Sequence, residues 1–273
     1  MNYVEPIFRP PSEAASLLLQ TTIGCSHNRC TFCGMYATKR YELVDRDLIF
    51  TDIEEARARR DYRRAFLLDG DALAAPEDHL TAVLDRIQER LPWIERVGVY
   101  GDARSILDKG LDGMKRLGEK GLGIVYHGVE SGSPAVLEAV KKPLSFDEMA
   151  ETGRIMGACG VGYSVMALLG VGGVELSEEH ARDTGRALSL LDPDWIGLLT
   201  LMVVPGTALA RRETRGEFSL PDRFGMLGEL RRIMAGIEVE SARFSANHAS
   251  NYLPLRGDLP EDKAKLLALV DEI

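Results

Sequence analysis

Short apolar runs recur along the chain, separated by stretches in which apolar and polar residues alternate with a helical period. Six of these runs have the length expected of buried strands. They lie at residues 17–22, 65–68, 97–100, 124–127, 164–169 and 196–202. Alternating strand and helix patterns predict a parallel sheet, because parallel neighbours need a crossover connection between them.

Capping residues mark where several helices are expected to begin. Three capping boxes are present: Thr51 with Glu54, Ser105 with Asp108, and Ser145 with Glu148. Ser133 followed by Pro134 predicts a further start, with proline at the first helical position. Pro76 is expected to open a helix that runs to Leu91.

The six strand–helix units predict an α/β fold, a parallel-sheet partial TIM barrel of the (β/α)6 type. In such folds the functional groups gather at the carboxyl ends of the strands. We expect a single domain over residues 1–273, with the barrel core at 16–210 and a short C-terminal extension at 211–273 packing on it. Within the extension we expect helices at residues 218–236 and 260–273, a strand at 237–246 and a loop at 247–252.

Composition narrows the class of protein. Hydrophobic residues make up 45% of the chain and charged residues 27%, as in ordinary globular proteins. The formal net charge of −9 makes a nucleic-acid partner unlikely. No apolar run is long enough to cross a bilayer, and the N-terminus lacks the pattern of a secretory signal. A cytoplasmic location, where thiols stay reduced, is therefore expected.

Cys25, Cys30 and Cys33 lie within nine residues of each other, just past the first predicted strand. Three thiolates on one loop suit an iron–sulfur cluster with one iron left open, and a zinc site completed by His27 is the alternative. A disulfide framework is disfavoured because the loop holds an odd number of cysteines. The remaining cysteine, Cys159, is isolated in the sequence.

Further segments follow the other predicted strands. They are Asp69-Gly70-Asp71, Gly128-Val129-Glu130-Ser131-Gly132, Lys142 and the turn that begins at Gly170. Together with the C-x4-C-x2-C loop they resemble the radical S-adenosylmethionine (SAM) superfamily over residues 16–210. The spacing departs from the commonest family pattern, which has three residues between the first two cysteines.

The resemblance implies a [4Fe-4S] cluster held by Cys25, Cys30 and Cys33, and SAM as the second cofactor. It also implies cofactor-binding roles for Phe32, Asp69, Gly70, Asp71, Glu130, Lys142 and Gly170. Phe32 would shield the cluster, the Asp69–Asp71 turn would receive the SAM amino group, and Lys142 would pair with the SAM carboxylate. From the residues alone, two alternatives stay open. The Asp69–Asp71 turn could be an ordinary strand-to-helix turn, and the glycine turn at Gly170 is equally typical of a phosphate-binding loop.

The resemblance further implies a radical SAM oxidoreductase, transferase or lyase. In that family the reduced cluster cleaves SAM to a 5′-deoxyadenosyl radical, which abstracts hydrogen from the substrate. A small-molecule substrate and a reduced flavodoxin or ferredoxin as electron donor are the expected partners, with no membrane partner. Two alternatives stay open: a zinc-stabilised barrel hydrolase, and a non-catalytic iron–sulfur electron-transfer protein.

Candidate substrate contacts lie at strand ends and in the tail loop. They are Tyr100, Asp102, Arg104, His127, Asn247, His248, Asn251 and Tyr252. For each of them a structural role is favoured, because loops rich in Asn and Ser commonly form turns. The sequence therefore leaves the substrate and the reaction type open.

Overall fold

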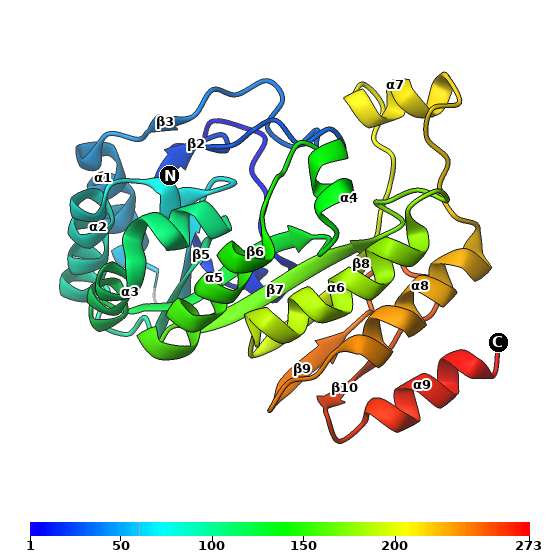
Figure 1. Ribbon diagram of the computed structural model, residues 1–273. Coiled ribbons are helices and arrows are strands. Elements are labelled where there is room, and N and C mark those ends of the chain that lie inside the picture. Colours follow the sequence, from blue (N-terminus) through cyan, green and yellow to red (C-terminus); the bar gives the residue numbers. More distant parts are fainter. Residues whose placement is uncertain (60) are drawn as a thin grey trace. The chain divides into compact units, whose positions relative to one another are not determined.

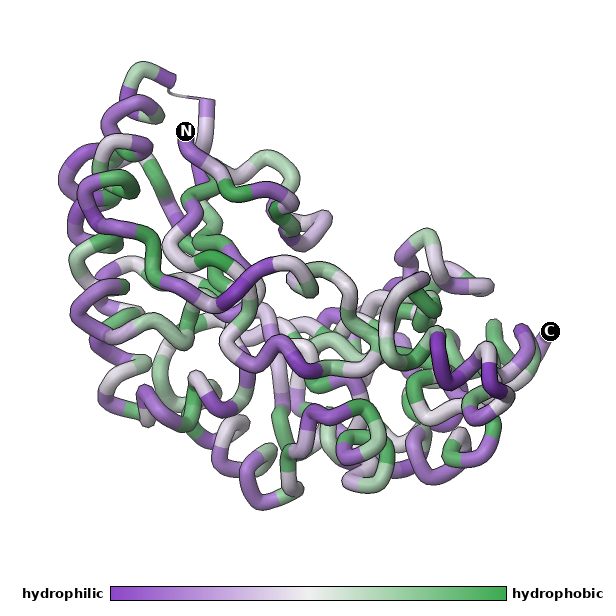
Figure 2. The backbone as a smooth tube through the Cα atoms, turned by 90° about the horizontal axis from the view of Figure 1, so that it is seen from above, coloured by the Kyte–Doolittle hydropathy of each residue, from purple (hydrophilic) through white to green (hydrophobic). Residues whose placement is uncertain are grey.

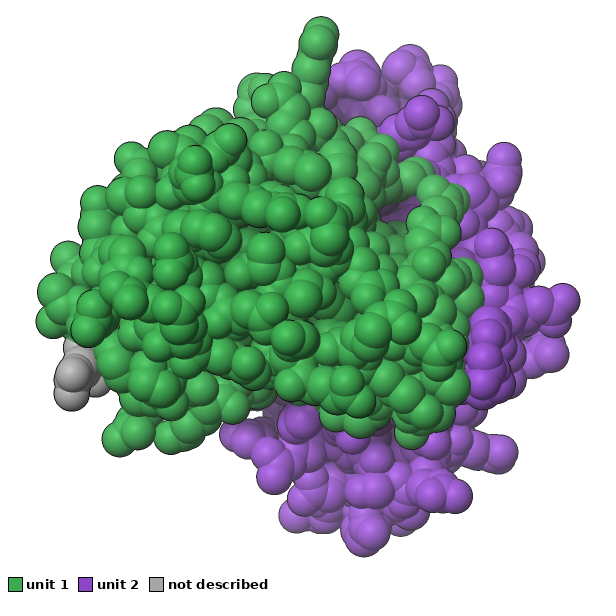
Figure 3. All heavy atoms as spheres, turned by 90° about the vertical axis from the view of Figure 1, so that its left-hand side faces the viewer, with its two compact units in different colours: residues 1–28, 35–127, 155–162 green, residues 29–34, 128–154, 163–273 purple. Residues whose placement is uncertain are grey.

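The computed structural model describes residues 1–59 and 61–273. The described chain divides into two compact units, which Figure 3 colours separately. The first unit consists of residues 1–28, 35–127 and 155–162, and the second of residues 29–34, 128–154 and 163–273. Each unit therefore combines segments that are distant in sequence, and the expectation of a single domain stays a prediction.

The first unit is built on parallel strands. In spatial order these are β1 (Leu17–Gln20), β4 (Arg64–Leu68), β5 (Arg96–Tyr100) and the first part of β6 (Leu122–Glu130). A short antiparallel pair joins β2 (Thr22–Ile23) to β3 (Glu42–Leu43). Its helices are α1 (Arg46–Arg57), α2 (Glu77–Arg90), α3 (Ala103–Glu119) and the end of α5 (Phe146–Cys159), with 3-10 turns at Pro11–Glu13 and Ala72–Ala74. Helices α1, α2 and α3 lie side by side (Figure 1).

The second unit continues the strand–helix pattern. Its strands are, in spatial order, β7 (Gly162–Leu169), β8 (Trp195–Thr200), β9 (Ala242–Ser245) and β10 (Arg256–Leu259). β8 is parallel to both β7 and β9, and β10 is antiparallel to β9. Its helices are α4 (Pro134–Ala139), most of α5, α6 (Ser177–Leu191), α7 (Ala208–Thr214), α8 (Arg223–Gly236) and α9 (Lys263–Asp271). Helix α8 packs against α6 on one side and α9 on the other (Figure 1).

Helical periodicity explains how these helices bury one face. Helix α2 buries Leu80, Val83, Leu84 and Ile87, which are spaced i, i+3, i+4 and i+7. Green apolar and purple polar residues alternate along such helices in Figure 2. Strand β4 is buried over four of its five residues, as expected for a strand covered on both faces.

The parallel-dominated, eight-stranded sheet with surrounding helices confirms the predicted α/β partial barrel. All six predicted strands form, with 17–22 divided between β1 and β2, and with β6 longer than predicted. The tail strand forms as β9, whereas β10 and α7 were not predicted. None of the helices in the described part of the chain has the length and apolar character that a membrane crossing needs.

Two of the predicted capping boxes are wrong. Helix α1 begins earlier, with Asp45 as its N-cap, and Thr51 instead donates a hydrogen bond within the helix to the Asp47 carbonyl. Helix α3 is capped by Asp102, so Ser105 lies inside it. In both cases an aspartate a few residues upstream supplies a strong cap, and the later Ser or Thr is not needed. The box at Ser145 and the cap at Ser133 are confirmed.

Candidate functional site

Cys25, Cys30 and Cys33 lie on the connection between β2 and β3. Each is partly exposed, and none of them forms a disulfide within the described residues. Cys25 belongs to the first unit, whereas Cys30 and Cys33 belong to the second. The two ends of this loop therefore have surroundings in different units.

The turn after β4, at Asp69 and Gly70, makes two hydrogen bonds to Gly24, the residue before Cys25. The Gly24 amide donates to Oδ2 of Asp69 at 3.0 Å, and the Gly24 carbonyl accepts from the Gly70 amide at 3.0 Å. A Cβ atom on Gly70 would lie 2.4 Å from Cε2 of Tyr36 and 3.0 Å from Cβ of Cys25. Only glycine allows the main chain to approach the cysteine this closely.

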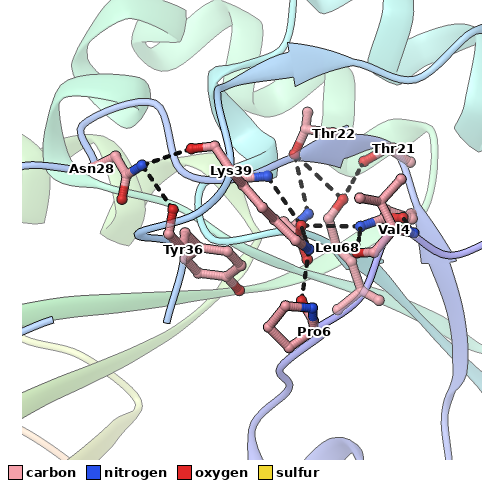
Figure 4. Close-up of polar contacts among 11 residues, drawn as sticks. Val4, Pro6, Thr21, Thr22, Asn28, Tyr36, Lys39 and Leu68 are labelled. Atoms are coloured by element: carbon pink, nitrogen blue, oxygen red, sulfur yellow. Dashed lines mark hydrogen bonds and ion pairs between the residues drawn. The ribbon is translucent and has the colours of Figure 1, made fainter. Parts of the chain in front are cut away.

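Asp69 forms a buried ion pair with Lys39. The Lys39 Nζ lies 2.8 Å from Oδ2 of Asp69, and the two side chains are 3% and 0% exposed. The same oxygen accepts a hydrogen bond from Nε2 of Gln20 at 3.0 Å, and Lys39 also donates to the Pro6 carbonyl at 2.6 Å. Figure 4 shows Lys39 within this network, beside Pro6 and Leu68. Lys39 was not predicted, because a lone lysine in a loop carries no local signal in the sequence.

Asp71 is also held by internal donors. Its carboxylate accepts from the Ser105 hydroxyl at 2.8 and 3.0 Å, from the Asp102 amide at 3.0 Å and from the Ser26 hydroxyl. Burial raises the pKa of Asp71, although these hydrogen bonds oppose the shift. Both carboxylates of the Asp69–Asp71 turn thus shape the loop that carries Cys25, and their roles toward SAM stay predictions.

The candidate substrate contacts of the first unit have structural partners. Asp102 caps α3 by accepting from the Arg104 amide, and Nη1 of Arg104 lies 3.2 Å from Nδ1 of His27. The Tyr100 ring meets the Phe66 ring edge-on at 5.0 Å, and burial raises the pKa of its hydroxyl. His127 is fully buried in β6.

The Arg104 guanidinium beside His27 disfavours a cationic zinc ion at that imidazole.

In the second unit, the residues around Cys30 and Cys33 bridge two helices. The Thr31 amide donates to the carbonyl of Val140, the C-cap of α4, and the Thr31 carbonyl accepts from the Leu209 amide in α7. Phe32 packs against a cluster formed by Val136, Val140, Val171, Leu201 and Leu209. The aromatic ring is thus held by the core of this unit, and its predicted role beside the cluster stays a prediction.

Glu130 and Lys142, which were predicted separately, form one ion pair. The Lys142 Nζ lies 3.1 Å from Oε1 of Glu130, and the side chains are 15% and 13% exposed. Lys142 also donates to the Gly128 carbonyl. Glu130 has a φ of +66°, a left-handed conformation that is uncommon outside glycine and is often found at functional sites.

Gly170 ends β7 with a φ of +82° and is packed against α8. The positive φ favours glycine here, and a Cβ atom would also lie 2.3 Å from Cε of Met226, so that side chain would have to move. The Gly170 amide donates to Oε2 of Glu229 at 2.6 Å. The following Gly172 and Gly173 line a pocket of about 430 Å³ whose wall includes Val140, Arg212 and Phe218. Glu229, in α8, was not expected from sequence.

The tail loop is attached to the carboxyl end of β8. The Asn251 carboxamide accepts from the Thr200 amide at 2.7 Å and donates to the Leu198 carbonyl at 2.7 Å. Nδ1 of His248 lies 2.8 Å from the Ser250 hydroxyl, and Tyr252 is 60% exposed. Asn251 therefore pairs with the main chain at the end of β8, beyond the part that pairs with β9. The predicted substrate contacts of this loop stay predictions.

The residues of the loop fit an iron–sulfur cluster by donor chemistry. Three thiols on one loop are the ligand set of a cluster with an open iron, and Gly70 leaves room for the β4 turn against Cys25. Within residues 1–59 and 61–273, no group of three or more His, Cys, Asp or Glu side chains stands together ready to hold a metal. The fit thus rests on ligand type and on the surroundings of Cys25.

Solved structures share this fold. The methyltransferase TsrM from Kitasatospora setae, with cobalamin and a [4Fe-4S] cluster bound, is 20% identical with a TM-score of 0.59, covering 71% of this chain and 38% of its own. Coproporphyrinogen III oxidase HemN from Escherichia coli is 17% identical with a TM-score of 0.58, covering 81% and 51%. The chain thus spans 38% to 51% of the lengths of these two proteins. At these identities the likeness shows the fold alone.

No curated protein matches the chain. The family model of the radical SAM superfamily matches residues 19–185, which is more than half of the chain and includes the three cysteines, Glu130, Lys142 and Gly170. The family match, the parallel-dominated sheet and the C-x4-C-x2-C loop lead to the same conclusion: the chain belongs to the radical SAM superfamily.

Proposed function

We propose that this protein is a radical SAM enzyme in which Cys25, Cys30 and Cys33 hold a [4Fe-4S] cluster. The observation that carries the proposal is the C-x4-C-x2-C loop inside the family match, which follows β1 and β2 in the chain. The Asp69–Asp71 turn supports it, because it is packed directly against Cys25. Strand ends of this kind are where parallel α/β folds place their chemistry.

When bound, the cluster and SAM would supply a 5′-deoxyadenosyl radical for hydrogen abstraction from the substrate. The chain's own residues bind and orient the cofactors. The Lys142 ammonium is suited to the SAM carboxylate, and the Glu130 carboxylate to hydroxyl or ammonium donors. Since these two side chains already pair at 3.1 Å, cofactor binding would exchange part of that pair for new partners. Phe32 would contribute an apolar surface that excludes water.

We propose a small molecule as substrate. The net charge of −9 disfavours a nucleic acid, and a TsrM structure contains tryptophan as substrate. A one-electron donor, a reduced flavodoxin or ferredoxin, would supply the reducing equivalent. A cytoplasmic location belongs to the same proposal, because reduced thiols are needed for cluster assembly.

The test is anaerobic reconstitution with iron and sulfide, reduction with dithionite, and mass spectrometry of the products from SAM. We expect 5′-deoxyadenosine from the wild type. Separate Cys25→Ala, Cys30→Ala and Cys33→Ala variants should lose bound iron and product together. The matched control is Cys159→Ala, which removes a buried cysteine outside the loop and should retain both.

Other outcomes would contradict the proposal. S-Adenosylhomocysteine without 5′-deoxyadenosine would indicate methyl transfer, as in the methyltransferase neighbour TsrM. A well-formed cluster without SAM cleavage would favour electron transfer. Tightly held zinc with no uptake of iron would favour the zinc-stabilised hydrolase.

A further inference from the structure

Two buried polar side chains of the second unit each hold a segment that is predicted to bind SAM. One segment contains Glu130, Ser131 and Gly132 after β6, and the other is the turn at Gly170 after β7. These side chains are His180 of α6 and Glu229 of α8, which are both fully buried. Neither residue belongs to the cysteine loop or to the predicted SAM contacts.

His180 holds the first segment. Its Nδ1 lies 2.8 Å from the Ser131 hydroxyl and 3.2 Å from the Thr184 hydroxyl. The Thr184 oxygen accepts from the Gly132 amide at 2.9 Å, and the Ser131 oxygen accepts from the Ser133 amide at 3.0 Å. With both oxygens accepting from amides, the nearer hydroxyl, that of Ser131, can donate its hydrogen to the one lone pair of Nδ1 in a neutral imidazole.

Burial favours the same neutral form, because it lowers the pKa of His180 to about 4. With Nδ1 as acceptor, the ring proton resides on Nε2. Nε2 lies 3.8 Å from Oε2 of Glu229, which is near it but beyond hydrogen-bond distance. The imidazole therefore presents its acceptor to the Ser131 segment and its N–H toward α8.

Glu229 holds the second segment. Its Oε2 accepts from the Gly170 amide at 2.6 Å, the contact that fixes the first residue after β7. The approach on this side is tight, since a Cβ on Gly170 would meet Met226 of the same helix at 2.3 Å. The other segment is equally constrained, because a Cβ on Gly132 would lie 2.0 Å from the Asp183 carbonyl. The Gly132 turn therefore has no room to shift independently of the main chain of α6.

We propose that His180 and Glu229 are positioning residues for SAM, acting through the main chain at Gly132 and Gly170. This inference rests on the proposed function. Glu229 lies in the C-terminal extension, so the extension contributes to cofactor binding through α8 as well as covering the core. The physical reason is that a fixed main-chain turn costs less conformational entropy when ligand binds than a mobile one.

The test compares Glu229→Ala with Glu229→Gln, which keeps an oxygen that can accept from the Gly170 amide. Hydrogen–deuterium exchange of the apo protein reports the positioning directly. We expect Glu229→Ala to speed exchange at Gly170 by about tenfold or more, as for the loss of one buried hydrogen bond. Anaerobic calorimetry of reconstituted protein with equal iron content should show SAM binding weakened about tenfold, and Glu229→Gln should restore most of both.

The control is Glu13→Ala, which removes another fully buried carboxylate, one that accepts from Tyr126 Oη at 2.6 Å in the first unit. It should lower stability but leave Gly170 exchange and SAM affinity unchanged. SAM affinity that is equal in wild type and Glu229→Ala overturns the inference alone. Glu13→Ala weakening SAM binding as much as Glu229→Ala also overturns it, since the effect would then be general. A reconstituted wild type that binds no SAM overturns the proposed function instead.

Discussion

Replacing Lys39 by methionine should destabilise the first unit strongly. The substitution keeps a side chain of similar length but removes the ammonium that lies 2.8 Å from Oδ2 of Asp69. Asp69 is 0% exposed, so its charge would have no access to water. Two neutral donors would remain on that oxygen, from Gln20 and the Gly24 amide.

The expected cost follows from the burial of the pair. Breaking a buried ion pair by removing one partner costs about 3–5 kcal/mol, because the other charge is left uncompensated. That is a large part of the ~5–15 kcal/mol by which domains are stable. In the double variant Lys39→Met with Asp69→Asn no charge is left buried, so its cost should be smaller than that of Lys39→Met alone.

The assay is urea unfolding of the reduced apo protein, followed by circular dichroism, for the two single variants and the double variant. The control is Arg231→Met, which breaks the exposed pair of Arg231 and Asp271 and should have a much smaller, salt-sensitive effect. A Lys39→Met variant that loses less than ~1 kcal/mol would refute the reasoning. So would a double variant whose cost equals the sum of the single costs, since uncoupled residues do not form a functional ion pair.

Three further predictions concern single side chains. Gly70→Ala should cost about 1–3 kcal/mol and reduce iron uptake on reconstitution, because the new Cβ would lie 2.4 Å from the Tyr36 ring; Gly157→Ala, at an open helical position, should cost nothing in the same measurements. Folding lowers the pKa of His180 from 6.5 to about 4, so below pH 6.5 the unfolded chain binds a proton that the folded chain does not. Stability should therefore fall by roughly 3 kcal/mol as the pH drops from 6.5 to 4, and a His180→Asn variant measured by urea unfolding at pH 7 and pH 5 should show a flatter dependence. Asn251→Ala should speed amide exchange at the end of β8, because it removes the nearer of the two acceptors of that strand's last amide, at 2.7 Å, and leaves only the Ser250 hydroxyl at 3.2 Å. Unchanged exchange would show that the Ser250 hydroxyl is sufficient.

Local sequence patterns were sufficient for most of the fold. A buried strand is visible in the sequence as a short apolar run, so the ends of β4, β5, β7 and β8 were predicted to within one or two residues. Helix starts were less certain, because more than one residue can serve as a cap. Asp45 and Asp102 displaced the predicted capping boxes downstream of them, and only the geometry of the chain decides between such competitors.

For the site, the sequence by itself supplied the predictions: three thiols at C-x4-C-x2-C spacing as cluster ligands, and Glu130 and Lys142 as SAM contacts. Tertiary structure alone decided which distant groups hold the turns of the site in place. Lys39 meets Asp69 across 30 positions of sequence, and Gly170 meets Glu229 across 59. Such partners carry no periodicity or spacing of their own, because burial, which makes each contact strong, exists only once distant segments have packed together.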